Sequence, residues 1–234
     1  MCPTYPKTME KEQTLLNKFG INLDQLSKSQ AVLQDYENLA GLNRGHLNPS
    51  GQHSDSSSRT ATFTLTNIVP QDEKLNGGTW NNYGKQAMMR KTQGCNTTYV
   101  VVGAVPGKNY IAKGRVNIPS YLWSSACCEV DTHHWKSWAV IAENDKNEVQ
   151  LLTLGQLEDE LTRLYGRKQR NPVAIQFLLT CVAWFNNKEL FCFGTVMRVF
   201  QQDLPPSYDA ALSHLLWLEA ASTERQELTS SDVK

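Results

Sequence analysis

Two short apolar runs and one amphipathic segment most strongly limit how this chain can fold. Residues 99–105 (YVVVGAV) and 137–142 (SWAVIA) are rich in β-branched side chains, which is typical of buried strands. Residues 152–165 carry apolar side chains at helical spacing with acidic residues between them, and this pattern predicts an amphipathic helix. Because the expected strands gather in clusters rather than alternating with helices, we predict an α+β fold.

Weaker patterns predict the remaining elements. Apolar spacing indicates a helix over 30–39, partial alternation indicates a strand over 62–69, and a Gly-Gly turn precedes an expected helix over 75–89. After a Pro-Pro pair, Ser207 is placed to cap a last helix that runs through Glu219.

The length of the chain suits one domain with tails. We expect a loosely attached polar N-terminal arm over 1–29, one globular domain over 30–200, and a C-terminal helix and polar tail over 201–234. No apolar run reaches the roughly 18 residues that a membrane span requires. The longest apolar stretch, 174–185, is interrupted by polar residues and is typical of a buried strand or core helix.

Charge is balanced overall but unevenly distributed. The 23 basic and 23 acidic residues give no net charge, so a globally basic nucleic-acid binder is not indicated. Residues 80–120 contain no Asp or Glu but six basic side chains: Lys85, Arg90, Lys91, Lys108, Lys113 and Arg115. Such a region can steer a polyanion. An ordinary solvated surface is the other interpretation, and both remain open.

The pairs Cys127-Cys128 and His133-His134 also leave two interpretations open. Two thiolates and two imidazoles can hold zinc. Adjacent residues on a strand point to opposite faces, however, which argues against convergence on one ion. The alternative is a core cysteine or a disulfide, with exposed histidines.

The N-terminus lacks the apolar core and cleavage site of a signal peptide. Asn96-Thr97-Thr98 is an N-glycosylation sequon, which matters only if the protein enters the secretory route.

The segment around His46 carries the residues best suited to phosphodiester hydrolysis. Histidine can take a proton from an attacking water near neutral pH, and the nearby Arg44 can neutralise phosphate charge. Mg²⁺ prefers oxygen ligands and keeps most of its waters, so one side-chain carbonyl, such as that of Asn67, can anchor it. Each of these residues alone is more often structural.

Taken together, three segments resemble the DNA/RNA non-specific endonucleases of the ββα-metal, or His-Me finger, fold. NRGHLNP resembles the family's D-R-G-H motif, TFTLTNIVPQ matches T-F-x-L-x-N-x-x-P-Q, and LNGGTW matches L-N-x-x-x-W. QAVLQDY, TYVVVGAVPG and RVNIPSYLW resemble one vertebrate branch. The resemblance covers roughly residues 30–166 and implies a mostly antiparallel central sheet flanked by helices.

The resemblance implies a metal-dependent endonuclease that hydrolyses DNA or RNA without sequence specificity. Carried over by position, His46 would be the general base and Asn67 the only protein ligand of a divalent cation, expected to be Mg²⁺. Arg44 would lie near the substrate phosphate, and Asn76 near the metal site. DNA, RNA or both are the expected partners, and the relatives imply an extracellular or secretory location.

Three departures weaken the expectation of activity. Asn43 replaces the acid of D-R-G-H, and Gly84 stands where the family usually has a glutamate that orients metal-bound water. Only 45 residues precede His46, so we expect a chain shortened at its N-terminus. The alternative is a degenerate nuclease-fold protein that binds nucleic acid or a protein without cleaving.

The motif order also predicts a geometry. Residues 44–47 and 62–65 should form two antiparallel strands with the helix after Leu75 packed across them. His46 and Asn67 should then face one cleft, with their side chains less than about 8 Å apart so that one hydrated ion can bridge them.

Overall fold

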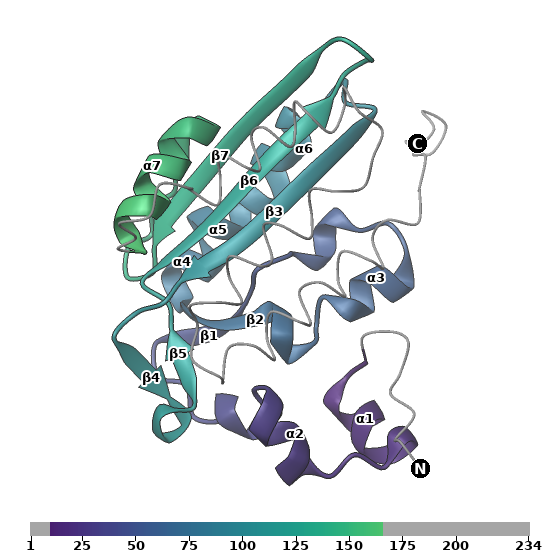
Figure 1. The fold of residues 1–234 in the computed structure, drawn as a ribbon, viewed down its shortest axis with the longest axis vertical. Helices are drawn as coiled ribbons and strands as arrows, with labels where there is room; N and C mark the ends of the chain where they lie inside the picture. Colours follow the sequence, from purple (N-terminus) through teal and green to yellow (C-terminus); the bar gives the residue numbers. More distant parts are fainter. Residues whose placement is uncertain (1–9, 166–234) are drawn as a thin grey trace.

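A four-stranded antiparallel sheet forms the centre of the protein, whose computed structural model describes residues 10–165. Its strands are β3 (Thr97–Val105), β6 (Tyr121–Glu129), β7 (Trp135–Glu143) and β8 (Gln150–Leu152), in the order β3-β6-β7-β8. Helix α7 covers one face, and the helical segments α4 to α6 cover the other (Figure 1). The predicted α+β class with a mostly antiparallel sheet is confirmed.

Both faces of the sheet are buried, which explains the continuous apolar runs in its sequence. Successive side chains of β6 and β7 point to opposite faces. The core under α4 to α6 contains Leu122, Ala126, Cys128, Trp138, Val140 and Ala142. The core under α7 contains Cys127, Ala139 and Ile141. The strand predicted over 137–142 is therefore confirmed as part of β7.

Helix α7 (Leu154–Leu164) confirms the predicted amphipathic helix. Thr153 and Gln156 form a capping box at its start, and Leu157 and Leu161 are buried against the sheet. The strand predicted over 99–105 is also present, as β3. It is half-buried rather than fully buried, because β3 is an edge strand of the sheet.

The helix predicted over 75–89 is divided into several pieces. They are α4 (Glu73–Gly77), α5 (Thr79–Asn82), the π-helical turn η4 (Tyr83–Ala87) and α6 (Met88–Lys91). The first break lies at Gly78, where a Cβ would approach the Lys74 carbonyl and the Asn147 side chain to 2.4 Å. Asn147 Oδ1 accepts hydrogen bonds from the backbone and hydroxyl of Thr79, so the close approach also caps α5.

A separate antiparallel pair, β1 (Leu42–His46) and β2 (Ile68–Asp72), precedes α4 directly. Asp72 caps α4, so strand, strand and helix form one continuous ββα unit. The prediction that 62–65 would form the second strand is wrong.

The reason lies in the threonines at the start of that segment. The Thr62 and Thr64 hydroxyls donate to carbonyls three residues earlier, which favours a turn over a ladder. The 3₁₀ turn η3 (Leu65–Asn67) follows, and β2 begins only at Ile68. Between the strands lie η2 (Ser50–Gln52) and α3 (Ser56–Ala61).

The N-terminal stretch is more ordered than the sequence predicted. Residues 10–29, expected as a loose arm, contain α1 (Glu12–Phe19) and α2 (Leu23–Ser29) around a small apolar core. The helix expected over 30–39 is reduced to the 3₁₀ turn η1 (Leu33–Tyr36).

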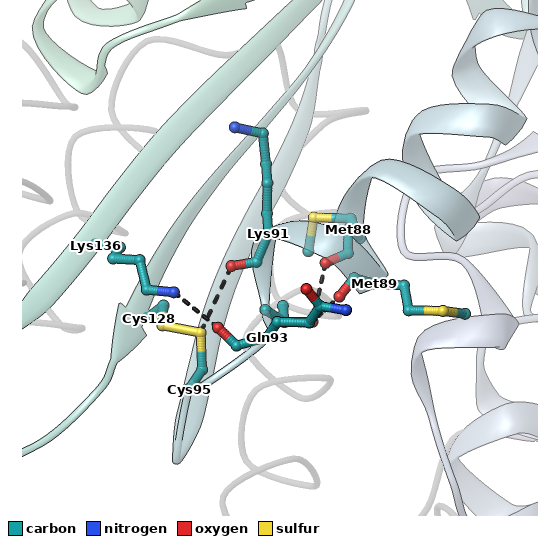
Figure 2. The surroundings of a disulfide bond; sticks show 8 residues. Met88, Met89, Lys91, Gln93, Cys95, Cys128 and Lys136 are labelled. Carbon is teal, nitrogen blue, oxygen red and sulfur yellow. Dashed lines mark hydrogen bonds between the residues drawn. A yellow bond between two sulfur atoms is a disulfide. The ribbon is translucent and has the colours of Figure 1, made fainter.

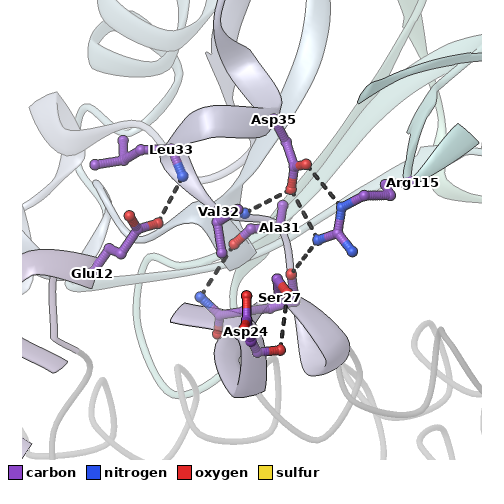
Figure 3. Close-up of polar contacts among 9 residues, drawn as sticks. Glu12, Asp24, Ser27, Ala31, Val32, Leu33, Asp35 and Arg115 are labelled. Carbon is purple, nitrogen blue, oxygen red and sulfur yellow. Dashed lines mark hydrogen bonds and ion pairs between the residues drawn. The ribbon is translucent and has the colours of Figure 1, made fainter. Parts of the chain in front are cut away.

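One ion pair joins this N-terminal stretch to a small β-ribbon. The ribbon consists of β4 (Asn109–Ile111), the turn η5 (Ala112–Gly114) and β5 (Val116–Ile118). Arg115 binds both carboxylate oxygens of Asp35, at 2.8 and 3.1 Å, and also donates to the Gln30 carbonyl (Figure 3). One of the six basic residues in 80–120 is therefore engaged in a structural contact.

A disulfide between Cys95 and Cys128 joins the turn after α6 to β6 (Figure 2). This confirms the disulfide interpretation for Cys128 and removes its thiolate from any zinc site. His133 and His134 lie in an exposed turn, where His134 Nδ1 contacts Asp131.

Two further predictions concern membrane-spanning helices and the C-terminal part of the chain. None of the helices within residues 10–165 has the length and apolarity of a membrane span. The predicted helix from Ser207 to Glu219 and the 201–234 tail lie outside the described residues, as does the end of the 30–200 domain.

Candidate active site

His46 is the last residue of β1 and lies beside an exposed aromatic ring. Its imidazole meets Phe63 edge to face, with ring centroids 4.8 Å apart and planes at 86°. The side chain is half-buried, and its Nε2 is enclosed with no hydrogen-bond partner among the described residues. An enclosed nitrogen without a partner costs free energy, and a donor on a bound water or substrate would offset that cost.

The surroundings keep His46 neutral. Burial, and secondarily the charge of Arg44, lower the pKa of its imidazole below the ordinary value of 6.5. Arg44 lies two residues earlier on β1 and therefore on the same face of the strand. A neutral imidazole is the form that can accept a proton, so His46 has the protonation state of a general base near neutral pH.

The glycine between these two residues is required by packing. A Cβ at Gly45 would lie 2.2 Å from Oε1 of Gln71, whose side chain is fully buried beneath β1. Gly45 therefore allows Gln71 to fill the opposite face of the strand, which leaves Arg44 and His46 on the other face.

Asn67 has a structural environment instead of an open one. It is 1% exposed, and its Nδ2 donates to the carbonyls of Asn48 and Thr62 at 2.8 and 2.9 Å. Its Oδ1 accepts from the Asn48 N–H at 2.9 Å. The side chain thus holds the turn after His46 against the turn that carries Phe63.

Asn76 occupies a position better suited to an ion. It lies on α4, which packs against both β1 and β2, and it is half-buried. Its amide has no hydrogen-bond partner within the described part of the chain. Asn43, in contrast, is exposed on β1 opposite Gln71.

Gly84 lies within the π-helical turn and faces the loop that follows His46. A Cβ at this position would contact only the Pro49 ring, at the ordinary van der Waals distance of 3.6 Å, so the backbone here can accommodate the Cβ of a larger residue. Gln52 donates to the Gly84 carbonyl at 3.4 Å. Trp80 is buried in the core beside this turn.

The donor set of the site is mainly amides and one imidazole. Within residues 10–165, no three His, Cys, Asp or Glu side chains cluster in a way that would hold a metal ion. A hydrated cation anchored by one amide oxygen and by substrate phosphate needs no such cluster. Asn76 fits this requirement because its half-buried amide has no hydrogen-bond partner among residues 10–165, whereas the amide of Asn67 is engaged.

Sequence reasoning missed two residues that shape the site, Phe63 and Asn48, and a contact that His53 makes with Asn48. Phe63 and Asn48 lie inside the motifs that carried the resemblance, but nothing in a motif distinguishes a side chain that packs from one that is exposed. His53 Nε2 contacts Asn48 Oδ1 at 3.0 Å, and burial is the main reason that its pKa is also lowered. Its position in a polar loop gave no signal of this contact.

Comparison with known proteins identifies the family of this ββα unit. A profile of the DNA/RNA non-specific endonucleases matches residues 18–166. The mouse (Mus musculus) endonuclease domain-containing 1 protein is 30% identical over 141 residues, which cover 58% of this chain and 27% of that protein. The zebrafish (Danio rerio) mitochondrial nuclease EXOG is 30% identical over 107 residues, covering 45% of this chain and 30% of the relative.

Among solved structures, a chain from the EndoG/EndoGI complex overlaps with a TM-score of 0.48 at 20% identity. The overlap covers 68% of this chain and 66% of that one. The chain thus spans roughly a quarter to a third of the length of the curated relatives named above.

Proposed function

The chain belongs to the DNA/RNA non-specific endonuclease family, and on this premise we propose that it hydrolyses phosphodiester bonds in DNA or RNA without sequence specificity. The observation that carries this proposal is the position of the half-buried His46 at the end of β1, two residues from Arg44 and within the ββα unit.

In the proposed reaction, His46 accepts a proton from a water molecule that attacks phosphorus. A P–O bond forms to the water oxygen as the bond to the leaving sugar oxygen breaks, and a proton from solvent completes the leaving alcohol. The guanidinium of Arg44 is exposed beside His46 and supports the proposal by offering donors to a phosphate oxygen. Gly45 and Gln71 keep both side chains on this face.

We propose Asn76, rather than Asn67, as the residue that holds a divalent cation, expected to be Mg²⁺. A bound cation would supply charge neutralisation on the phosphate and on the leaving oxygen. Asn67 instead supports the site by holding the turns on either side of His46.

Gly84 favours a second candidate function, in which the site binds nucleic acid or a protein without cutting. No carboxylate is present at position 84, where the family usually carries a glutamate. Side chains that orient the groups bound to a metal ion typically change metal affinity or activity about 10- to 100-fold.

Plasmid cleavage by the full chain across a Mg²⁺ series tests both candidates. Nicking that requires Mg²⁺ and that Gly84→Glu enhances supports a nuclease limited by the missing carboxylate. Absence of cutting by wild type and Gly84→Glu at every Mg²⁺ concentration would replace the nuclease proposal with the binding one.

We also propose that the natural protein matures in the secretory route. The Cys95–Cys128 disulfide supports this, because such bonds persist in oxidising compartments, and the sequon residue Asn96 is exposed. A natural protein from cells that carries no glycan on Asn96 and remains cytosolic would contradict this location.

A further inference from the structure

Phe63 is a large apolar side chain left in solvent directly beside the proposed general base. It is 53% exposed, although an aromatic ring of this size gains much free energy from burial. A single exposed apolar residue is ordinary in itself. The contact with the His46 ring at 4.8 Å gives this residue its significance, because a substrate bound at His46 would lie within reach of the Phe63 ring.

The backbone holds Phe63 outward. Its two neighbours, Thr62 and Thr64, are buried, and their hydroxyls donate to the backbone of the preceding turn. The Thr62 carbonyl also accepts from Asn67 Nδ2, and the same amide binds Asn48 beyond His46. One buried side chain therefore fixes the position of Phe63 relative to the loop that leaves His46, so the ring is preorganised.

Charge near the ring suits a nucleic-acid strand. Arg44, beside His46, and Arg59, at the end of α3 four residues before Phe63, are both exposed. Guanidinium groups bind phosphates, while an exposed aromatic ring offers a flat surface to a base. Every nucleobase has such a face, so a stacking contact would not impose sequence specificity.

We propose that Phe63 forms a stacking site for an unpaired nucleobase next to the phosphodiester bond that His46 attacks. The inference rests on the proposed function and adds a substrate class to it, namely single strands and locally unpaired segments. The competing role is that Phe63 only shields and orients the imidazole. The substitution Phe63→Leu distinguishes the stacking role from the shielding role, because leucine keeps an apolar cover over His46 but offers no aromatic face.

The test compares Phe63→Leu and Phe63→Trp with wild type in the full chain. Tyr110→Leu is the matched control, since Tyr110 is 52% exposed on β4. Binding of a short fluorescein-labelled oligothymidylate is measured by anisotropy without Mg²⁺, so cleavage is not required. An oligonucleotide of the same length with abasic sugars serves as the second probe. Circular dichroism verifies that each variant is folded.

Stacking predicts that Phe63→Leu weakens oligothymidylate binding by about 5- to 100-fold, while Phe63→Trp and Tyr110→Leu retain it. Binding of the abasic probe should be the same for wild type and Phe63→Leu. In cleavage assays the loss should fall on KM for single strands, and the acidic limb of the pH profile should not move. A loss confined to kcat with a shifted pH profile, or equal binding by wild type and Phe63→Leu, would overturn the stacking site.

These readouts separate this inference from the proposed function. Binding that depends on Phe63 in a protein that never cuts would reject the nuclease proposal but keep the stacking site. Cutting that is indifferent to Phe63 would do the reverse, and absence of oligothymidylate binding by wild type would reject the stacking site outright.

Discussion

The asparagines at positions 67 and 76 should respond differently to alanine. Asn67→Ala leaves three buried or partly buried backbone groups without their partner, so we expect the free energy of unfolding to fall by about 2–4 kcal/mol. Asn76→Ala should change stability by less than about 1 kcal/mol but raise the Mg²⁺ concentration needed for cleavage by about 10-fold or more. Urea unfolding and a Mg²⁺ titration measure the two effects. A Mg²⁺ response unchanged in Asn76→Ala but shifted in a stable Asn67→Ala would return the ligand role to Asn67.

Arg44 and Arg59 allow a matched test of the electrostatics around the two half-buried histidines. The Arg44 charge lowers the pKa of His46, and the Arg59 charge lowers that of His53. Of the two histidines, Arg44→Gln should therefore raise the pKa of His46 alone, and Arg59→Gln that of His53 alone. Because the neutral imidazole is the base, the acidic limb of any cleavage profile should move to higher pH in Arg44→Gln. Histidine NMR titrations give both pKa values, and a His46 value unaffected by Arg44→Gln would contradict this coupling.

Between elements, the Asp35–Arg115 pair should make stability depend on pH. Burial alone would raise the pKa of Asp35, but hydrogen bonds from Arg115 and Val32 and the Arg115 charge lower it overall. A lowered carboxyl pKa stabilises the fold above the unfolded-state value, near 3.9, and this contribution is lost as pH falls through the folded-state value.

Asp35→Asn should consequently be less stable than wild type at neutral pH, by about 1–3 kcal/mol. The difference should shrink below about pH 4. Urea midpoints across a pH series check this, and a difference that stays constant down to acid pH would show that the pair contributes no charge-dependent stability.

The Cys95–Cys128 disulfide should stabilise the contact between α6 and the sheet. It closes a segment with a sequence separation of 33, which corresponds to about 3–4 kcal/mol if the bond acts by limiting the unfolded chain. We expect the free energy of unfolding of the double variant Cys95→Ala with Cys128→Ala to be lower than that of wild type by this amount. Its urea midpoint should fall accordingly. An unchanged midpoint would mean that packing of Met88 and Trp138 suffices to hold α6 in place.

For the whole molecule, sequence patterns predicted the long elements well and the short ones poorly. The β7 run and the α7 spacing were recoverable because burial on a sheet imposes a clear period over many residues. Thr62 and Thr64 look like strand residues, and only their hydroxyl bonds to the backbone reveal a turn. The break at Gly78 depends on Asn147, a contact that no local pattern encodes.

The candidate site was predictable in its motifs but not in its geometry. His46 and Arg44 follow from residue chemistry and from the resemblance, and the structure places both on one face of β1. Whether the amide of an asparagine is free or holds a turn depends on packing. The sequence alone therefore could not distinguish the roles of Asn67 and Asn76. The same applies to Phe63, whose exposure depends on hydrogen bonds of its neighbours.

Plasmid cleavage by His46→Ala, with His53→Ala as the matched control, tests the proposed general base most directly. Both histidines are half-buried with lowered pKa values, but only His46 lies on β1 beside Arg44. At neutral pH and across a Mg²⁺ series, His46→Ala should cut about 10²- to 10⁴-fold more slowly than wild type. Added Mg²⁺ should not restore the rate, because it cannot replace the missing proton acceptor, and His53→Ala should stay within a few-fold of wild type. Cutting by His46→Ala at the wild-type rate would contradict the assignment of His46 as the base.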